Sequence, residues 1–97
     1  MARFDVFRLT DGTFVLDCQS DGLMHLNTRL VVPLWPPANA PLAAARMNPV
    51  LKINGQDFVM VTQFASAVAL TQLREHVATL SDSHLSILAA LDFLIGG

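Results

Sequence analysis

Residues 50–62, which read VLKINGQDFVMVT, decide the fold class because they predict a β-hairpin. Asn54-Gly55 at the centre is the pair that a type I′ turn prefers, since both central residues of that turn need positive φ. Residues 50–53 and 56–62 on either side are rich in Val, Ile, Met and Phe, as strands are. We therefore expect two antiparallel strands joined by a two-residue turn.

Upstream, the sequence predicts a second hairpin and a third strand. Residues 2–9 and 14–19 both alternate in polarity, and Asp11-Gly12 between them can take positive φ. Residues 29–32 then predict a strand that ends at Pro33.

The segments on either side of the central hairpin are less regular. Residues 33–49 hold all five prolines, which indicates a long stiffened connection with a helical turn over 42–47. Downstream, residues 65–73 fit a strand or a helix, and we favour a strand. Residues 74–80 are interpreted as a connector.

The carboxyl-terminal residues 81–97, SDSHLSILAALDFLIGG, predict a helix that begins at Ser81 as its N-cap. Apolar side chains follow over nearly the whole helix circumference, with Ser86 and Asp92 as the polar interruptions. A short chain cannot surround such a helix, so we expect part of it to meet another polypeptide. Together the elements indicate one α+β domain over 1–97, mostly β, with an antiparallel and partly barrel-like sheet.

The composition limits the possible partners and location. The chain is 53% hydrophobic and only 14% charged, against roughly 25% charged in typical soluble domains, which favours a homodimer. A net charge of −2 with no Lys/Arg cluster argues against direct nucleic-acid binding. No stretch approaches the ~20 apolar residues of a membrane span, and no signal peptide is evident. A single cysteine, Cys18, suits a reducing cytoplasm.

Several short segments, read in order, resemble the CcdB family, the toxin half of type II toxin–antitoxin systems. Their order and spacing carry the likeness over nearly the whole chain: RFDV (3–6), LDCQSD (16–21), RLVVPL (29–34), NPVLKING (48–55), MVT (60–62), AS (65–66) and VATLS (77–81). The resemblance implies an SH3-like antiparallel sheet or partial barrel with a small extra sheet, a C-terminal α-helix and a homodimer.

The resemblance also implies a function without catalysis. Family toxins bind the A subunit of DNA gyrase, trap the enzyme on cleaved DNA and serve in plasmid maintenance. A small antitoxin neutralises them by wrapping the toxin with a disordered C-terminal tail. No catalytic, cofactor or metal residue is implied.

The candidate gyrase-binding residues are the last five of this sequence: Phe93, Leu94, Ile95, Gly96 and Gly97. Family toxins characteristically end in Trp-Gly-Ile, with the ring stacking on a gyrase arginine. This sequence has no tryptophan there. If Gly97 matches the penultimate glycine of the family, Gly96 stands where the tryptophan belongs. The alternative is a purely structural role, in which the helix packs in the core and at the dimer interface.

Other residue types have a structural and a functional interpretation. Trp35 either caps the core from a rigid loop or anchors a partner such as the antitoxin. Cys18 shares a strand face with apolar residues and is interpreted as a small buried hydrophobe. The three histidines share no ligand spacing with one another or with Cys18. The arginines are expected to be solvated charges that could meet an acidic antitoxin tail: Arg3, Arg8, Arg29, Arg46 and Arg74.

Two alternatives to gyrase poisoning stay open. One is an SH3-barrel endoribonuclease toxin of the MazF type, which needs a basic, hydroxyl-bearing RNA groove that the acidic sequence does not indicate. The other is a CcdB-like protein with lost or altered gyrase poisoning, suggested by the changed tail.

Overall fold

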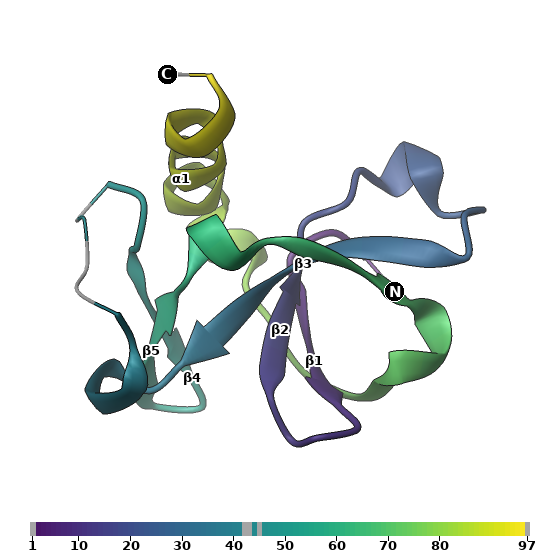
Figure 1. Cartoon of the computed structure of the whole chain (residues 1–97), viewed down its shortest axis with the longest axis horizontal. Coiled ribbons are helices and arrows are strands. Elements are labelled where there is room, and N and C mark those ends of the chain that lie inside the picture. Colours follow the sequence, from purple (N-terminus) through teal and green to yellow (C-terminus); the bar gives the residue numbers. More distant parts are fainter. Residues whose placement is uncertain (1, 42–43, 45, 97) are drawn as a thin grey trace.

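The computed structural model of the chain describes residues 2–41, 44 and 46–96. In this part of the chain, seven strands form one curled antiparallel sheet, and an α-helix packs against it (Figure 1). Their bounds are β1 Asp5–Leu9, β2 Phe14–Asp17, β3 Thr28–Trp35, β4 Val50–Ile53, β5 Gln56–Met60, β6 Ser66–Ala69, β7 Leu73–Thr79 and α1 His84–Ile95.

The long strand β3 organises the sheet. The order is β4-β5-β3-β2-β1-β7, and β6 pairs with β3 as well. Thr28–Val31 of β3 pair with β6, whereas Leu34 and Trp35 pair with β5. This change of partner along one edge separates the β4–β5 hairpin, a small wing, from the curled main sheet (Figure 1).

Both predicted hairpins are confirmed. Asn54 and Gly55 have φ values of 52° and 84°, as a type I′ turn requires. Gly12, in the first hairpin, has φ of 89°. The first strand begins at Asp5 rather than at residue 2, because Phe4 has a φ of 73° that interrupts the extended backbone.

The expectation that the third strand ends at Pro33 is wrong, because β3 continues to Trp35. Proline lacks an N–H and is normally excluded from the middle of a sheet. Pro33 is tolerated because it lies between the β3 residues that pair with β6 and those that pair with β5. Its carbonyl still accepts the Val61 N–H at 3.0 Å.

The interpretation of residues 74–80 as a connector is also wrong, since Leu73–Thr79 form β7. This strand pairs with β1 at the end of the sheet order, and its consecutive charged residues, Arg74 and Glu75, are exposed. Charged side chains are common on edge strands because they discourage further strand addition. The predicted strand over 65–73 is half right: β6 covers Ser66–Ala69, and a 3-10 turn over Leu70–Gln72 follows.

The helix is present but begins later than predicted. Ser81–Ser83 form a 3-10 turn, and α1 starts at His84, so Ser81 is not its N-cap. The His84 ring Nδ1 lies 3.0 Å from the Ser81 carbonyl oxygen. The helical turn predicted over 42–47 lies partly outside the described residues.

The hydrophobic side chains form two clusters, one on each face of the curled sheet. The larger one joins strand residues such as Leu16 and Val32 to Ile87 and Ala90, the buried residues of α1. The smaller one, inside the curl, is centred on Phe7, Val15 and Val31. Within the described residues, therefore, the covered part of α1 is the stripe that contains Ile87 and Ala90.

Candidate functional site

The sequence predicts that the end of α1 binds the target, and in the structure this end is apolar and exposed. Phe93, Leu94 and Ile95 are 40%, 38% and 81% exposed, and Gly96 is exposed as well. Gly97 lies outside the described residues. The C-terminus projects away from the sheet (Figure 1). We refer to residues 93–96 as the tip. Their exposure agrees with the expectation that one chain cannot cover this helix.

Gly96 is required by the backbone at this point. It caps the helix, its N–H donating to the Asp92 carbonyl oxygen at 2.6 Å. A Cβ at position 96 would lie 2.9 Å from that same oxygen, closer than real Cβ contacts allow. The local backbone geometry thus accounts for a glycine at position 96.

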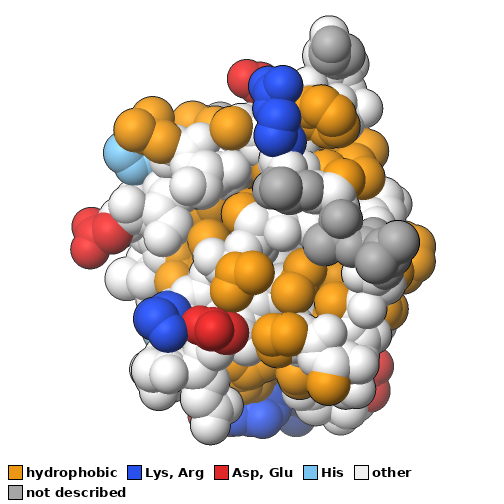
Figure 2. Space-filling view, turned by 90° about the vertical axis from the view of Figure 1, so that its left-hand side faces the viewer, with side chains coloured by type: hydrophobic (Ala, Val, Ile, Leu, Met, Phe, Trp, Pro, Cys, Tyr) orange, Lys and Arg blue, Asp and Glu red, His pale blue; other side chains and the backbone are white. Residues whose placement is uncertain are grey.

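A basic side chain covers part of the tip. The Arg46 guanidinium carbon lies 5.1 Å from the centroid of the Phe93 ring, within the range of a cation–π contact. Arg46 and Phe93 also line a hollow of about 470 Å³ together with Ala89, Asp92 and Gly96. Figure 2 shows basic, acidic and hydrophobic side chains side by side at this upper end of the molecule.

The loop that carries Arg46 is fixed by the buried residue Asn48. The Asn48 Nδ2 donates to the Met60 carbonyl oxygen at 3.0 Å and to Gln63 Oε1 at 2.7 Å. Its Oδ1 accepts the Ala44 N–H at 3.1 Å. The Thr62 hydroxyl also donates to the Met47 carbonyl oxygen. The base of the loop is therefore held against the end of β5, two residues from Arg46.

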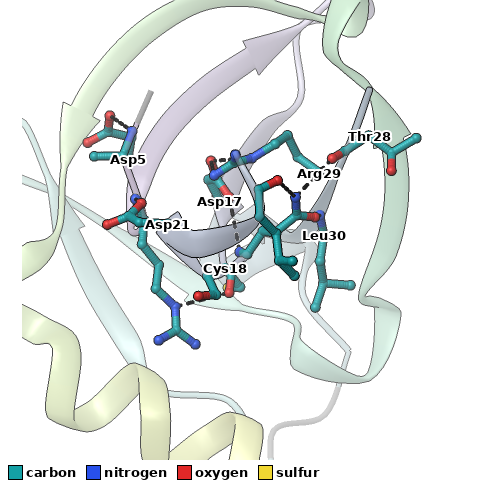
Figure 3. Close-up of polar contacts among 12 residues, drawn as sticks. Asp5, Asp17, Cys18, Asp21, Thr28, Arg29 and Leu30 are labelled. Carbon is teal, nitrogen blue, oxygen red and sulfur yellow. Dashed lines mark hydrogen bonds and ion pairs between the residues drawn. The ribbon is translucent and has the colours of Figure 1, made fainter. Parts of the chain in front are cut away.

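The expectation that Arg29 is a solvated charge is wrong. Its side chain is 1% exposed, and it forms an ion pair with Asp17, whose side chain is fully buried (Figure 3). The Arg29 Nε donates to Asp17 Oδ2 at 3.0 Å, and Nη2 lies 2.7 Å from the same oxygen without an aligned hydrogen bond. The buried pair lies where β2 meets β3, so Arg29 is not accessible to a partner.

Gln19 and Arg3 extend this polar network to the loop between β2 and β3. The Gln19 amide donates to the carbonyl oxygens of Leu23 and Thr28, each at 3.1 Å, and accepts the Leu30 N–H. The Arg3 Nε donates to the Cys18 carbonyl oxygen at 3.1 Å (Figure 3). The network holds the loop in place, and the large apolar residues exposed on it are Leu23, Met24 and Leu26.

Trp35 lies on a strand rather than in a loop. It is the last residue of β3, half-buried, with its ring edge-on to Phe64 at a centroid distance of 5.5 Å. It lines a hollow of about 550 Å³ whose other walls include Phe14, Phe58, Arg8 and Asn39. The ring is thus neither a sealed core residue nor a free surface anchor.

Cys18 and His76 each lie near an aspartate. Cys18 is 2% exposed, and burial, helped by the Asp17 carboxylate, raises the pKa of its thiol to about 12. His76 Nε2 lies 3.5 Å from Asp5 Oδ2. In the described part of the chain, no three His, Cys, Asp or Glu side chains converge as metal ligands. No helix of the described ranges is long and apolar enough to cross a membrane.

Sequence reasoning missed the Asp17–Arg29 pair and the contact between Arg46 and Phe93. The first had a signal, because opposite charges on neighbouring antiparallel strands can pair diagonally, and Asp17 pairs with Val31, two residues from Arg29. The second joins residues 47 positions apart through a proline-rich loop, for which the sequence offers no register.

Comparisons with known proteins give one family and one fold. The family model described as CcdB protein matches residues 3–97. No curated protein sequence matches the chain. A solved structure of an endoribonuclease from a mycobacterial species superimposes with a TM-score of 0.76 at 15% sequence identity, over 99% of this chain and 91% of that one. At this identity the likeness shows the fold alone, an SH3-like sheet with a C-terminal helix, as expected from the sequence.

Proposed function

The chain belongs to the CcdB family of toxin–antitoxin toxins, and from this premise we propose that it acts by binding the A subunit of DNA gyrase. In this proposal the protein traps the gyrase–cleaved-DNA complex and carries out no catalysis itself. A cognate antitoxin with a disordered tail neutralises it. We also propose that residues 1–97 act as one domain, as a homodimer and in the cytoplasm.

The observation that carries the proposal is the exposed apolar tip (93–96) on a CcdB fold. Phe93, Leu94 and Ile95 offer a compact apolar contact surface on a helix end that projects from the sheet. Poisoning requires the toxin to bind the gyrase state with broken DNA better than the resealed state. A small apolar tip can insert into an opening of gyrase in that state. Direct binding of DNA or RNA would instead need a basic surface.

The arginines available to an acidic antitoxin tail are fewer than the sequence indicated. Arg29 is buried against Asp17. Arg46 and Arg74 are exposed, and Arg8 is partly exposed while paired with Glu75 at 3.1 Å. We propose the exposed arginines as the charged contacts of the tail, because opposite charges steer a disordered segment to its partner.

A plasmid cleavage assay tests the proposal. Supercoiled plasmid is incubated with purified gyrase, ATP and the full-length protein, and in parallel with a variant that lacks residues 95–97. A second variant, Val50→Thr, removes an exposed apolar side chain on β4 and is the matched control. Circular dichroism and sedimentation confirm that each variant is folded and in the same oligomeric state.

We expect linear DNA with the full-length protein and with Val50→Thr, and none with the truncated variant. Absence of linear DNA with the folded full-length protein contradicts gyrase poisoning and favours the alternative of a family fold with a lost or changed target. Degradation of RNA by the protein without gyrase would instead support the endoribonuclease alternative, which the shared fold of the mycobacterial structure keeps in view.

A further inference from the structure

The contact between Arg46 and Phe93 covers part of the proposed binding surface in the protein alone. Arg46 reaches the tip from the loop before β4, and its guanidinium carbon lies 5.1 Å from the ring centroid. A ring face that holds a guanidinium is not free for the side chains of a partner. The tip and the loop therefore have to be considered together.

The electrostatics of the helix end explain why a cation settles there. The C-terminal end of a helix carries partial negative charge, which basic residues in the last turn usually balance. The last turn of α1 contains no basic residue, and it contains the carboxylate of Asp92 instead. The face of the Phe93 ring adds the negative part of its quadrupole. Arg46 supplies from another element the positive charge that α1 lacks.

The backbone next to Arg46 is held in place, whereas its side chain is exposed. Asn48 and Thr62 hold the backbone at Ala44 and Met47 through the hydrogen bonds described above. The Arg46 side chain itself is exposed, and beside it lies the hollow of about 470 Å³. The guanidinium can thus leave the ring by side-chain rotation, with no movement of the buried anchor.

We propose that Arg46 is an internal cap of the tip, which competes with the target for the Phe93 ring. A target that packs on Phe93 displaces the guanidinium, and the free energy of the cation–π contact is subtracted from binding. The inference rests on the proposed function, because it takes the tip as the target-binding surface. It assigns to Arg46 the role of weakening target binding, whereas a basic residue that touched the target directly would strengthen it.

A binding experiment with a double-mutant cycle tests this role. Affinity for the purified gyrase A subunit is measured for the wild-type chain, Arg46→Gln, Phe93→Leu and the double variant. An exposed cation–π contact corresponds to a change of about two- to fivefold in an equilibrium constant. We expect Arg46→Gln to bind about two- to fivefold more tightly than wild type, with no gain when the same change is made in Phe93→Leu.

Lys52→Gln is the matched control, because it removes an exposed basic side chain from β4 rather than from the loop at the tip. It is expected to leave the affinity unchanged, and denaturant unfolding checks that all variants are folded. If wild type binds and Arg46→Gln binds equally or more weakly, the cap is overturned and the proposed function stands. If the wild type does not bind gyrase at all, the proposed function fails and the cap, which depends on it, fails with it.

Discussion

At the scale of single residues, the buried Asp17–Arg29 pair leads to a prediction about stability. Both side chains are buried and pair within 3.0 Å. Asp17→Ala leaves the Arg29 charge buried without a partner, which typically costs about 3–5 kcal/mol of folding free energy. Since small domains have about 5–15 kcal/mol in total, we expect a large fall in the urea midpoint of unfolding.

Two further variants keep this prediction open to contradiction. Asp57→Ala breaks the surface pair between Lys52 and Asp57, in which the side chains are 73% and 50% exposed, respectively. This change is expected to lower the free energy of unfolding by less than about 1 kcal/mol. The double variant Asp17→Leu with Arg29→Met replaces both buried charges by apolar groups and should recover most of the stability. Equal effects of Asp17→Ala and Asp57→Ala would show that the buried pair contributes no more than the exposed one.

Cys18 gives a pH dependence whose sign follows from its burial. The pKa of its thiol is raised from 9.0 to about 12 in the folded protein, so the folded state holds the proton over a range in which the unfolded state loses it. The stabilisation is complete below pH 9 and is lost as the pH rises from 9 to 12. We expect the free energy of unfolding to fall by up to about 1.4 kcal/mol per pH unit in that window.

The composition makes this measurement clean. The chain has no tyrosine and a single lysine, Lys52, so few other side chains titrate between pH 9 and 12. Cys18→Ala lowers the stability at pH 7 by removing a buried sulfur, yet its alkaline slope should be shallower than that of the wild type. Parallel slopes in urea unfolding at pH 8, 9.5 and 10.5 would contradict the assignment.

At the scale of the elements, the turn of the β4–β5 hairpin sets a specific requirement. Gly55 has a φ of 84° with no atom near its missing Cβ, so the penalty of a side chain there is conformational rather than steric. Gly55→Ala should destabilise the protein by about 1–2 kcal/mol in thermal or urea unfolding. Gly22→Ala is the matched control: its φ is not in the left-handed region, and the nearest atom to an added Cβ is at 3.6 Å. It should be neutral or stabilising by up to about 1 kcal/mol.

The elements also show what sequence patterns can and cannot predict. Asn54-Gly55 and Asp11-Gly12 predict hairpins correctly because a turn is a local property of two residues. The pattern fails at β7 and at Pro33, where the outcome depends on which strand lies alongside. Pro33 stays in β3 only because its edge faces the change from β6 to β5. Such pairing depends on strands that are distant in the sequence, so a local sequence pattern does not predict it.

The candidate site divides in the same way. The apolar tip was predictable, since Phe93, Leu94 and Ile95 belong to a helix that is apolar all round. The placement of Arg46 over the tip was not, because it depends on how a loop with several prolines is folded back and held by Asn48. The burial of Arg29 likewise follows from strand register rather than from residue type.

At the scale of the whole molecule, the exposed apolar surface is the basis of the proposed homodimer. Leu85 and Ile95 on α1 are 73% and 81% exposed, and Leu30 on β3 is 40% exposed. Single exposed apolar residues are normal. In the described part of the chain, however, α1 buries Ile87 and Ala90 fully and Leu88 and Leu91 partly, while its other large apolar side chains are exposed: Leu85, Phe93, Leu94 and Ile95. A homodimer would cover part of this exposed surface, with the same surface used on both subunits.

Dimerisation makes the stability depend on protein concentration, and this is the measurement that decides it. For a folded dimer that unfolds to separate chains, the midpoint of thermal unfolding rises as the concentration is raised, because mass action favours association. We expect this rise, together with a mass near twice the 10.5 kDa of the chain in sedimentation equilibrium. Leu85→Glu is expected to lower the midpoint at low concentration if α1 lies at the interface, whereas Leu23→Glu, on the loop between β2 and β3, tests the other exposed apolar surface. A mass of one chain with a concentration-independent midpoint would contradict the homodimer and would leave gyrase and the antitoxin as the proposed partners of the exposed surface of α1.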